Sequence, residues 1–599
     1  MLPFPRRAAS ILPAGLLLLA PLLAQEASPG DSLLGSFEVP EGLDATLWAE
    51  SPSLFNPTAM DVDARGRLWV TEAVNYRQWG GRNPGKHFDG GDRVVILEDT
   101  DGDGVCDNSK VFVQDPDLTA PLGIAVVGDR IYVSCSPNLY VYEDTDGDDL
   151  ADRREVVLTG FGGFDHDHGL HSVVPHVDGK LYVAVGNAGP HMVTGPDGWS
   201  LRSGSLYRGG GPRSVENRPG LVSDDGRVWT GGLVLRMNHD GSDIEVMGHN
   251  FRNNYEVAVN AMGELFTADN DDDGNRSCRT AWVMPGGNYG FFSSDGSRSW
   301  QADRRPGLTT QEAHWHQGDP GVLPAGTING GGGPTGVAVY EGELMSRWID
   351  GAVLNCDAGA RVVYAHRPRA VGAGIELDPG FLIRPRADET GQTGQWFRPS
   401  DVAVGPAGEV YVADWYDPGV GGHAARDREA YGRILRIAPA GAEVKAPAVD
   451  VSRFAGALAA LKSPAPAVRE LAREALVMMG AEAAPALLMA AVSSGGDERF
   501  AARCAQVLTT METEEGLLKL PPPPAAGAAG TAIPLPPTSV FVLEAALRAD
   551  TNCLLSLSSD HRLYVWALRR DDVRDVREEV ERLKRTPFFR ANEDRRRVA

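Results

Sequence analysis

The chain has 599 residues, of which 42% are hydrophobic, and its 57 Lys and Arg against 81 Asp and Glu give a formal net charge of −24. This acidic balance argues against a nucleic-acid partner, because binding to phosphates needs a face rich in Lys and Arg. The six cysteines are scattered, without a C-x-x-C pair or a C-x-x-C-H haem-attachment pattern, so neither a zinc ribbon nor a bound haem c is expected.

The first 24 residues have the pattern of an export signal. Arg6 and Arg7 precede an apolar stretch at 11–23, and the sequence LLA at 22–24 offers a cleavage site. The apolar run is too short and too interrupted by proline for a good membrane span, and no other stretch approaches the roughly 18 apolar residues that a span needs. We therefore expect a cleaved signal peptide at 1–24 and a secreted or periplasmic mature chain without a transmembrane span.

A short phrase recurs along residues 34–439, consisting of a glycine or aspartate, alternating apolar residues and a turn. Its six copies read ARGRLWVTEA, VGDRIYVSCS, VDGKLYVAVG, AMGELFTADN, WIDGAVLNCD and PAGEVYVADW. Apolar residues with period two, rich in Val, Tyr, Phe and Trp, are typical of strands. Six such units without helical periodicity between them predict an all-β fold, a six-bladed β-propeller whose loops converge on one axial face. A β-sandwich is the alternative.

The pattern changes after Pro439. Residues 450–519 show helical apolar spacing with short breaks, and PAVRELAREALVMMG resembles one HEAT-type repeat, so a small α-helical HEAT-like region is expected there. Residues 520–537 are rich in Pro and Ala, which predicts a linker. Residues 538–599 are predicted to form a short helical segment with a solvated, charged face.

Two acidic phrases, EDTDGDGVCD at 98–107 and EDTDGDDLAD at 143–152, follow strand patterns. Each places aspartates at positions 1, 3, 5 and 9 of a loop, namely Asp99, Asp101, Asp103 and Asp107 in the first and Asp144, Asp146, Asp148 and Asp152 in the second. Alternate carboxylates on a tight loop suit Ca²⁺, which takes six to eight oxygens. We expect calcium sites that clamp two hairpins, with solvated turns as the alternative.

Histidines and an Arg-Asn-Asn string mark two further loops. The stretch FDHDHGLHSVVPH at 164–176 contains four histidines, and three readings stay open: a catalytic or cofactor-contacting histidine, a transition-metal site, or hydrogen bonds between blades. Arg252 and Asn253, in FRNN, suit an anionic or polyhydroxylated ligand because guanidinium offers a planar fork of donors. An ion pair between blades is the alternative for Arg252.

Longer strings carry a family resemblance. LTGFGGFDHDHGLHSVVPHVDGKLY, GHNFRNNYEVAVNAMGELFTADND, HWHQGDPGVLP and YVADWYDPGVGGHAARDREAYGRILRI follow one another in order. Over roughly residues 34–439 they resemble the membrane-bound dehydrogenase domain of planctomycete and verrucomicrobial proteins. Members of that family often continue with HEAT-like repeats and a c-type haem module. Because the haem motif is missing here, the chain resembles a short, haem-less member.

More distantly, the chain resembles the soluble quinoprotein glucose and aldose-sugar dehydrogenases. That resemblance implies pyrroloquinoline quinone with Ca²⁺, a histidine base and an arginine–asparagine pair beside the quinone. His168 or His171 matches the base, and Arg252 with Asn253 matches the pair. Further cofactor contacts have only candidates, which are Arg398, His423 and Arg433.

The expected function is therefore an exported, quinone-dependent dehydrogenase of a sugar or other alcohol, with a separate cytochrome as the electron acceptor. In this hypothesis a histidine takes the hydroxyl proton, and Arg252 stabilises negative charge on the reduced cofactor. Two alternatives remain: a non-catalytic propeller that binds a glycan or a protein, and a metal-dependent, lactonase-like hydrolase with ligands such as Asp269, Asn270 and Asp401.

Overall fold

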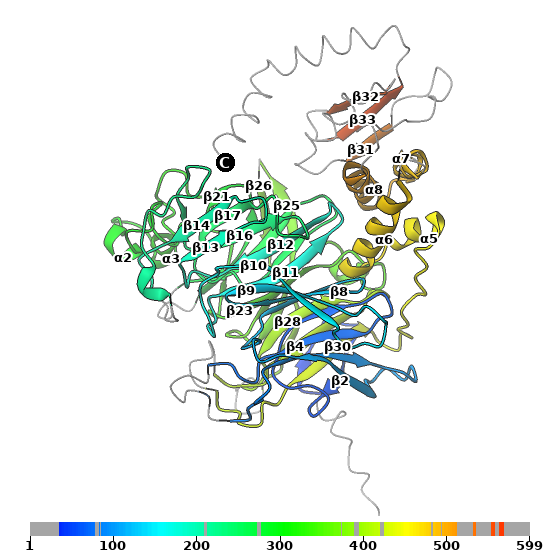
Figure 1. The fold of residues 1–599 in the computed structure, drawn as a ribbon, viewed down its shortest axis with the longest axis horizontal. Coiled ribbons are helices and arrows are strands. Elements are labelled where there is room, and N and C mark those ends of the chain that lie inside the picture. Colours follow the sequence, from blue (N-terminus) through cyan, green and yellow to red (C-terminus); the bar gives the residue numbers. More distant parts are fainter. Residues whose placement is uncertain are drawn as a thin grey trace, which may run out of the picture.

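The computed structural model in Figure 1 describes residues 35–77, 83, 85–208, 213–271, 277–372, 374–387, 394–419, 425–480, 483–492 and 494–511, together with three short strands beyond them. The predicted signal peptide at 1–24 lies outside the described residues. Within the part that is described, no helix is both long and apolar enough to cross a membrane.

Between residues 37 and 439 the described chain forms mainly small antiparallel sheets, six of which have four or more strands. The first three of these six, each given from its inner strand outward, are β3 (Pro57–Val62), β4 (Leu68–Glu72), β5 (Arg93–Glu98) and β6 (Asn108–Gln114); β7 (Gly123–Val127), β8 (Arg130–Cys135), β9 (Asn138–Glu143) and β10 (Arg153–Thr159); and β11 (Leu170–His176), β12 (Lys180–Val185), β16 (Gly232–Met237), β17 (Glu245–Phe251) and β21 (Gly287–Asn288).

The other three continue in chain order. They are β18 (Val257–Val259), β19 (Leu265–Asn270), β20 (Ser277–Val283) and β22 (Thr327–Gly330); β23 (Pro334–Val339), β24 (Val353–Asp357), β25 (Val362–Val371) with β26 (Gly374–Asp378), β27 (Phe381–Pro385) and β1 (Phe37–Glu38); and β28 (Pro399–Val404), β29 (Val410–Asp414), β30 (Arg433–Pro439) and β2 (Leu43–Glu50). A small sheet of β13 (His191–Thr194), β14 (Ser200–Gly204) and β15 (Trp229–Thr230) lies within the β12–β16 connection.

The six sheets close into a ring. Their inner strands contact one another in the order β3, β7, β11, β18, β23, β28 and back to β3. The early strand β2 pairs with β30, the last strand before the helices, with Thr46 opposite Arg436. An apolar cluster fills each gap between neighbouring sheets, so most strands are buried on both faces. The predicted all-β region is therefore confirmed, and its sheets follow one another around a ring instead of facing each other in a two-sheet sandwich.

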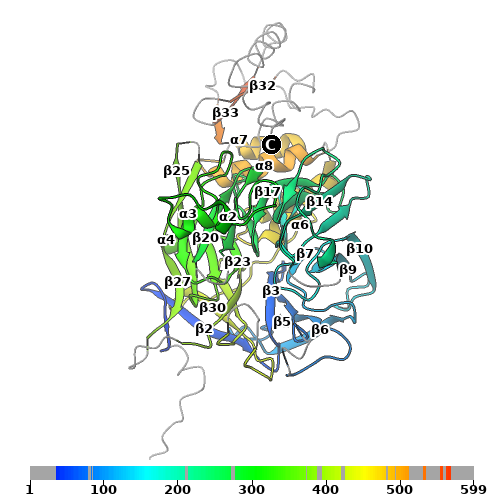
Figure 2. The same ribbon diagram turned by 90° about the vertical axis from the view of Figure 1, so that its left-hand side faces the viewer.

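Four helices follow the ring: α5 (Phe454–Ala460), α6 (Pro466–Met479), α7 (Ala484–Val492) and α8 (Glu498–Thr510). They pack around a shared apolar cluster that includes Leu461, Leu476 and Val507. Helix α6 contacts β7 and β11, and Arg503 on α8 donates to Glu341 Oε2 at 2.7 Å. The helices thus rest on one end of the ring (Figures 1 and 2), and their assignment as a HEAT-type repeat stays a prediction.

The described residues beyond 511 differ from the expected linker and helical tail. They form a three-stranded sheet of β31 (Thr531–Pro534), β32 (Cys553–Leu557) and β33 (Arg562–Ala567). Two of these strands lie inside the segment 538–599 that was expected to be helical. The sequence of β33, RLYVWA, holds Tyr, Val and Trp, which suit a pleated surface, and the apolar CLLSL of β32 pairs with it, which explains the difference. The rest of that segment lies outside the described residues.

Candidate functional site

The loops that precede the inner strands lie at the end of the ring away from α6. Two of them, the His-rich loop before β11 and the FRNN loop before β18, are tied together by the turn that follows β12. In this turn the Asn187 amide donates to the Arg252 carbonyl at 2.9 Å, and the Ala188 amide donates to the His168 carbonyl at 3.0 Å. The structure therefore brings His168 and Arg252, two of the predicted site residues, close together.

His168 is buried and bonded to the side chain of Asn187. Only 4% of the residue is exposed, and Nδ1 donates to Asn187 Oδ1 at 2.8 Å, which leaves Nε2 as the nitrogen with the lone pair. The ring stacks on Tyr207 with centroids 5.6 Å apart. Burial, followed by the positive charge of Arg252, lowers the pKa of His168 well below its ordinary value. Both effects favour the uncharged form of the imidazole.

His171, the other candidate base, lies beneath this surface. It is fully buried, and its Nδ1 and Nε2 lie 2.9 Å and 3.0 Å from the carbonyl oxygens of Asn254 and Asp167. The ring stacks on Tyr255 with centroids 4.7 Å apart. Because both nitrogens are held by backbone carbonyls, neither is directed at a ligand. The position of His171 is that of a support for the loop.

Three arginines lie close to His168 or to the adjacent Asp167, and each is less than 10% exposed: Arg252 acts on His168, and Arg77 and Arg398 act on Asp167. Arg252 Nη1 donates to Asn270 Oδ1 at 3.0 Å, Arg77 forms an ion pair with Asp167, and Arg398 lies 3.8 Å from Asp417. Burial opposes ionisation of Asp167, but the hydrogen bond from His166 and the positive charge of Arg77 hold its pKa well below the usual range. The arrangement favours an anionic ligand.

Arg77 is a site residue that the sequence reasoning missed. It follows the second strand of the first repeat, as Asn187 follows β12, and Asn270 is the last residue of β19, the second strand of its repeat. Reading the loop after each copy of the strand phrase would have found all three. The side chains also leave polar atoms for a ligand: Arg77 Nε, Asn187 Nδ2 and Asn253 Oδ1 are buried and have no hydrogen-bond partner in the described part of the chain.

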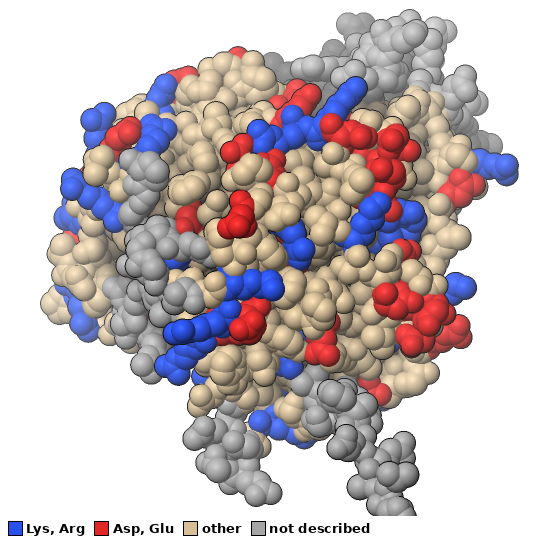
Figure 3. All heavy atoms as spheres, turned by 60° about the horizontal axis from the view of Figure 1, so that its bottom comes forward, with Lys and Arg blue, Asp and Glu red and all other residues tan. Residues whose placement is uncertain are grey.

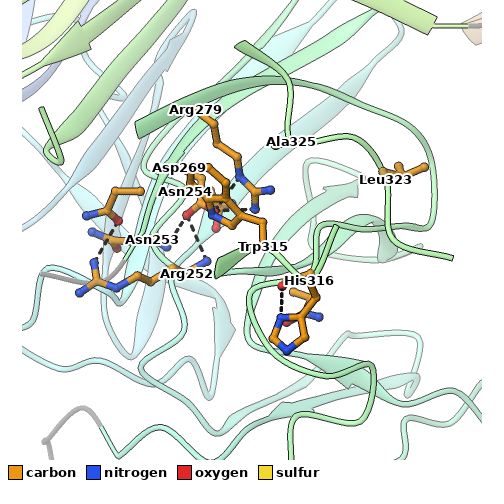
Figure 4. A network of polar contacts seen from close by, with 12 residues as sticks. Arg252, Asn253, Asn254, Asp269, Arg279, Trp315, His316, Leu323 and Ala325 are labelled. Carbon is orange, nitrogen blue, oxygen red and sulfur yellow. Dashed lines mark hydrogen bonds and ion pairs between the residues drawn. The ribbon is translucent and has the colours of Figure 1, made fainter. Parts of the chain in front are cut away.

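The FRNN loop rests on a buried ion pair (Figure 4). Asp269 Oδ1 accepts hydrogen bonds from the amides of Arg252 and Asn253 at 3.1 Å and 2.7 Å. Its Oδ2 accepts from Arg279 Nη2 at 2.7 Å, and the Arg279 guanidinium lies over the Trp315 ring, 4.7 Å from its centroid. Asp269 thereby fixes the backbone from which Arg252 projects.

Arg433, a candidate for cofactor contact, has the same role in another sheet as Arg279: it forms an ion pair with a buried aspartate, Asp414. Its Nε donates to Asp414 Oδ2 at 2.7 Å, and Asp414 Oδ1 accepts from the amide of Arg398 at 2.7 Å. The structure therefore makes Arg433 a support for Arg398. His423, the remaining candidate, lies outside the described residues.

The acidic phrases lie on the β5–β6 and β9–β10 hairpins, on outer strands, apart from the His168 site. Oxygens of Asp99, Asp101 and Asp103 lie within 4.8 Å of one another, as do those of the second group, formed by Asp144, Asp146 and Asp152. The two remaining aspartates do not join these groups: Asp107 accepts from Thr100, and Asp148 accepts from the amide of Leu150 at 2.9 Å.

The three residues considered as metal ligands of a hydrolase already form ion pairs or hydrogen bonds within the protein. Asp269 is paired with Arg279, and Asn270 bonds Arg252 and the Gly332 carbonyl. Both oxygens of Asp401 accept backbone amides, those of Met60 and Val402. On the face drawn in Figure 3 acidic and basic side chains are interspersed, without a single basic field.

Similarity to solved structures covers about two thirds of the chain. A structure titled as an oxidoreductase (glucose dehydrogenase) from Thermus thermophilus has 17% identity and a TM-score of 0.42, over 66% of this chain and 100% of that one. The PQQ domain of pyranose dehydrogenase from Coprinopsis cinerea has 15% identity and a TM-score of 0.43, over 67% and 97%. Aldose sugar dehydrogenase from Streptomyces coelicolor has 15% identity and a TM-score of 0.43, over 67% and 99%.

No curated protein matches the chain. The model of one protein family does match, over residues 28–440, a range that contains the whole ring of sheets and the His168 site. The chain therefore belongs to the family described as a domain of unknown function, DUF7133.

Proposed function

We propose that this protein is an exported, quinone-dependent dehydrogenase of a sugar or other alcohol, built on a six-bladed β-propeller. The observation that carries the proposal is a buried histidine, His168, with Arg252 beside it and with Arg77 and Arg398 near the adjacent Asp167, at one end of the ring. The six sheets are the blades, and the pairing of β2 with β30 joins the beginning and the end of the ring in the last blade.

The residues fit pyrroloquinoline quinone, a planar molecule with three carboxylates. The three guanidinium groups would hold these carboxylates, and the unpartnered atoms of Asn187 and Asn253 offer a donor and an acceptor to the ring system. When bound, the quinone supplies the chemistry of the site by accepting a hydride, and with it two electrons, from the alcohol carbon. Ca²⁺ is proposed for the two acidic hairpins.

His168 is the proposed general base. Its Nε2 takes the hydroxyl proton of the substrate, while Asn187 holds the tautomer in which that nitrogen carries the lone pair. Asp167, itself held by Arg77, raises the proton affinity of the ring and thereby stabilises the imidazolium that forms. Burial keeps the base uncharged before the reaction.

The setting of the reaction completes the proposal. Export through residues 1–24 would place the protein in the periplasm or outside the cell, and a small carbohydrate or alcohol would reach the open end of the ring. Since no C-x-x-C-H motif occurs in the sequence, electrons would pass to a separate cytochrome.

The test is reconstitution of the full mature chain with the quinone and Ca²⁺. Binding is followed by calorimetry, and dye reduction is assayed on a panel of sugars and alcohols. We expect quinone binding that weakens in Arg252→Gln, and turnover that is lost in His168→Gln although the quinone still binds. A folded protein that binds no quinone would refute the proposal, and sugar binding without the quinone would favour the non-catalytic alternative.

A further inference from the structure

We propose that Asp303, His316 and Asp319 form a binding site for a divalent transition-metal ion of the zinc class. The three residues belong to the segment between β21 and β22, which includes α2 (Trp300–Asp303) and α3 (Thr310–His314). This site is separate from the two acidic hairpins and from His168, and the proposed dehydrogenase does not use it.

The three side chains already converge. One ligand atom from each lies within 4.8 Å of the others, and His316 Nε2 is 3.5 Å from Asp303 Oδ2. Atoms bound to one zinc ion at about 2.0–2.2 Å are separated by comparable distances. An ion can therefore be accommodated with small side-chain shifts.

His316 supplies the independent sign of a ligand. The residue is only 3% exposed, and Nδ1 donates to the Gly290 carbonyl at 2.6 Å, which assigns the lone pair of the neutral ring to Nε2. Nε2 is buried and has no hydrogen-bond partner among the described residues. Its lone pair thus faces carboxylate oxygen, and a cation between the two removes the repulsion. Figure 4 shows this ring turned away from Arg252 and Asn253.

The donor set selects the kind of ion. Imidazole nitrogen with two carboxylates suits zinc and neighbouring transition metals, whereas Ca²⁺ and Mg²⁺ prefer oxygen alone. The outer contacts are those that orient metal ligands: Arg298 holds Asp303 at 2.7 Å, Arg305 holds Asp319 at 2.5 Å, and the Gly290 carbonyl holds the imidazole. Three protein ligands leave a coordination position for water.

The site also lies next to Trp315, which covers the Asp269–Arg279 ion pair beneath the FRNN loop. Trp315, next to His316, is fully buried and covers Arg279, the partner of Asp269. Helix α3 begins with a capping box between Thr309 and Glu312, which fixes the approach of this segment. A metal ion would therefore hold Trp315 over the ion pair.

The experiment measures zinc on the full chain after treatment with a chelator, by dialysis against Zn²⁺ in excess Ca²⁺ so that the acidic hairpins are occupied. Asp319→Asn and His316→Gln test the ligands, and Asp101→Asn, on a hairpin, is the matched control. Circular dichroism verifies that each variant is folded. Substitution with Co²⁺ gives a visible spectrum that reports nitrogen and oxygen ligands directly.

We expect wild type and Asp101→Asn to retain zinc with equal affinity, and both ligand variants to bind at least about tenfold more weakly and to lose the cobalt spectrum. Equal zinc retention by Asp319→Asn and wild type would overturn the proposal. So would the failure of wild type to retain zinc.

Discussion

Replacing Asp269 with alanine tests whether the FRNN loop depends on one buried carboxylate. Asp269 and Arg279 are both fully buried, so the substitution leaves a buried cation without its counter-charge, which costs about 3–5 kcal/mol. The amides of Arg252 and Asn253 lose their acceptor as well, at about 1 kcal/mol or more each. Since these losses share one side chain and are not additive, we expect about 4–6 kcal/mol in total.

The assay is urea unfolding followed by tryptophan fluorescence, with the free energy of unfolding obtained by linear extrapolation. The matched control is Glu376→Ala, which breaks the exposed Arg369–Glu376 pair and is expected to cost no more than about 1 kcal/mol. Asp269→Asn keeps an oxygen for the amides and should fall between the two. If Asp269→Ala destabilised the protein no more than Glu376→Ala, the reasoning about the buried pair would be wrong.

The titratable groups and the acidic hairpins give three further predictions. In the reconstituted enzyme we expect His168→Gln to lower kcat about 10²–10⁴-fold. Because the pKa of His168 is lowered, the acid limb of the wild-type pH–rate profile should lie below pH 6.5. An acid limb above that value would contradict a buried neutral base. Burial raises the pKa of Asp92 to about 7 from 3.8. Because the folded state then binds this proton more tightly than the unfolded state, the unfolding temperature should fall as the pH rises between these two values. Asp92→Asn should flatten this dependence on pH in thermal scans. Chelation of Ca²⁺ by EGTA should lower the unfolding temperature of wild type but leave the double variant Asp101→Asn, Asp146→Asn unchanged, and an equal response of both proteins would rule out calcium at the hairpins.

Local periodicity made the ring of sheets predictable. The six strand phrases place a turn and then alternating apolar residues where the second strand of each sheet forms, because tight turns and strands are encoded over a few neighbouring residues. The same holds for the acidic hairpins, where Asp99 and Asp144 each accept amides of their own loop. The helices after Pro439 were equally visible from their spacing.

The composition of the site was only partly predictable. FDHDHGLH offered three of the four histidines, and nothing in its spacing separated His168 from His171. The distinction arises because Asn187, from another loop, binds one ring, whereas backbone carbonyls enclose the other. The place of Arg77 in a loop after a strand phrase could be read from the sequence, but its role depends on meeting Asp167 from a distant loop.

The sequence by itself determined the repeated strands, the helical region and the acidic loops, because each depends on contacts between residues close in the chain. Only the tertiary structure decided that Arg433 supports Arg398 through Asp414, and that His316 meets Asp303 and Asp319 with an unpartnered nitrogen. These outcomes depend on which loops the closure of the ring places side by side, and on which polar atoms burial leaves without water. Such neighbours are set by long-range packing, which no single stretch of sequence encodes.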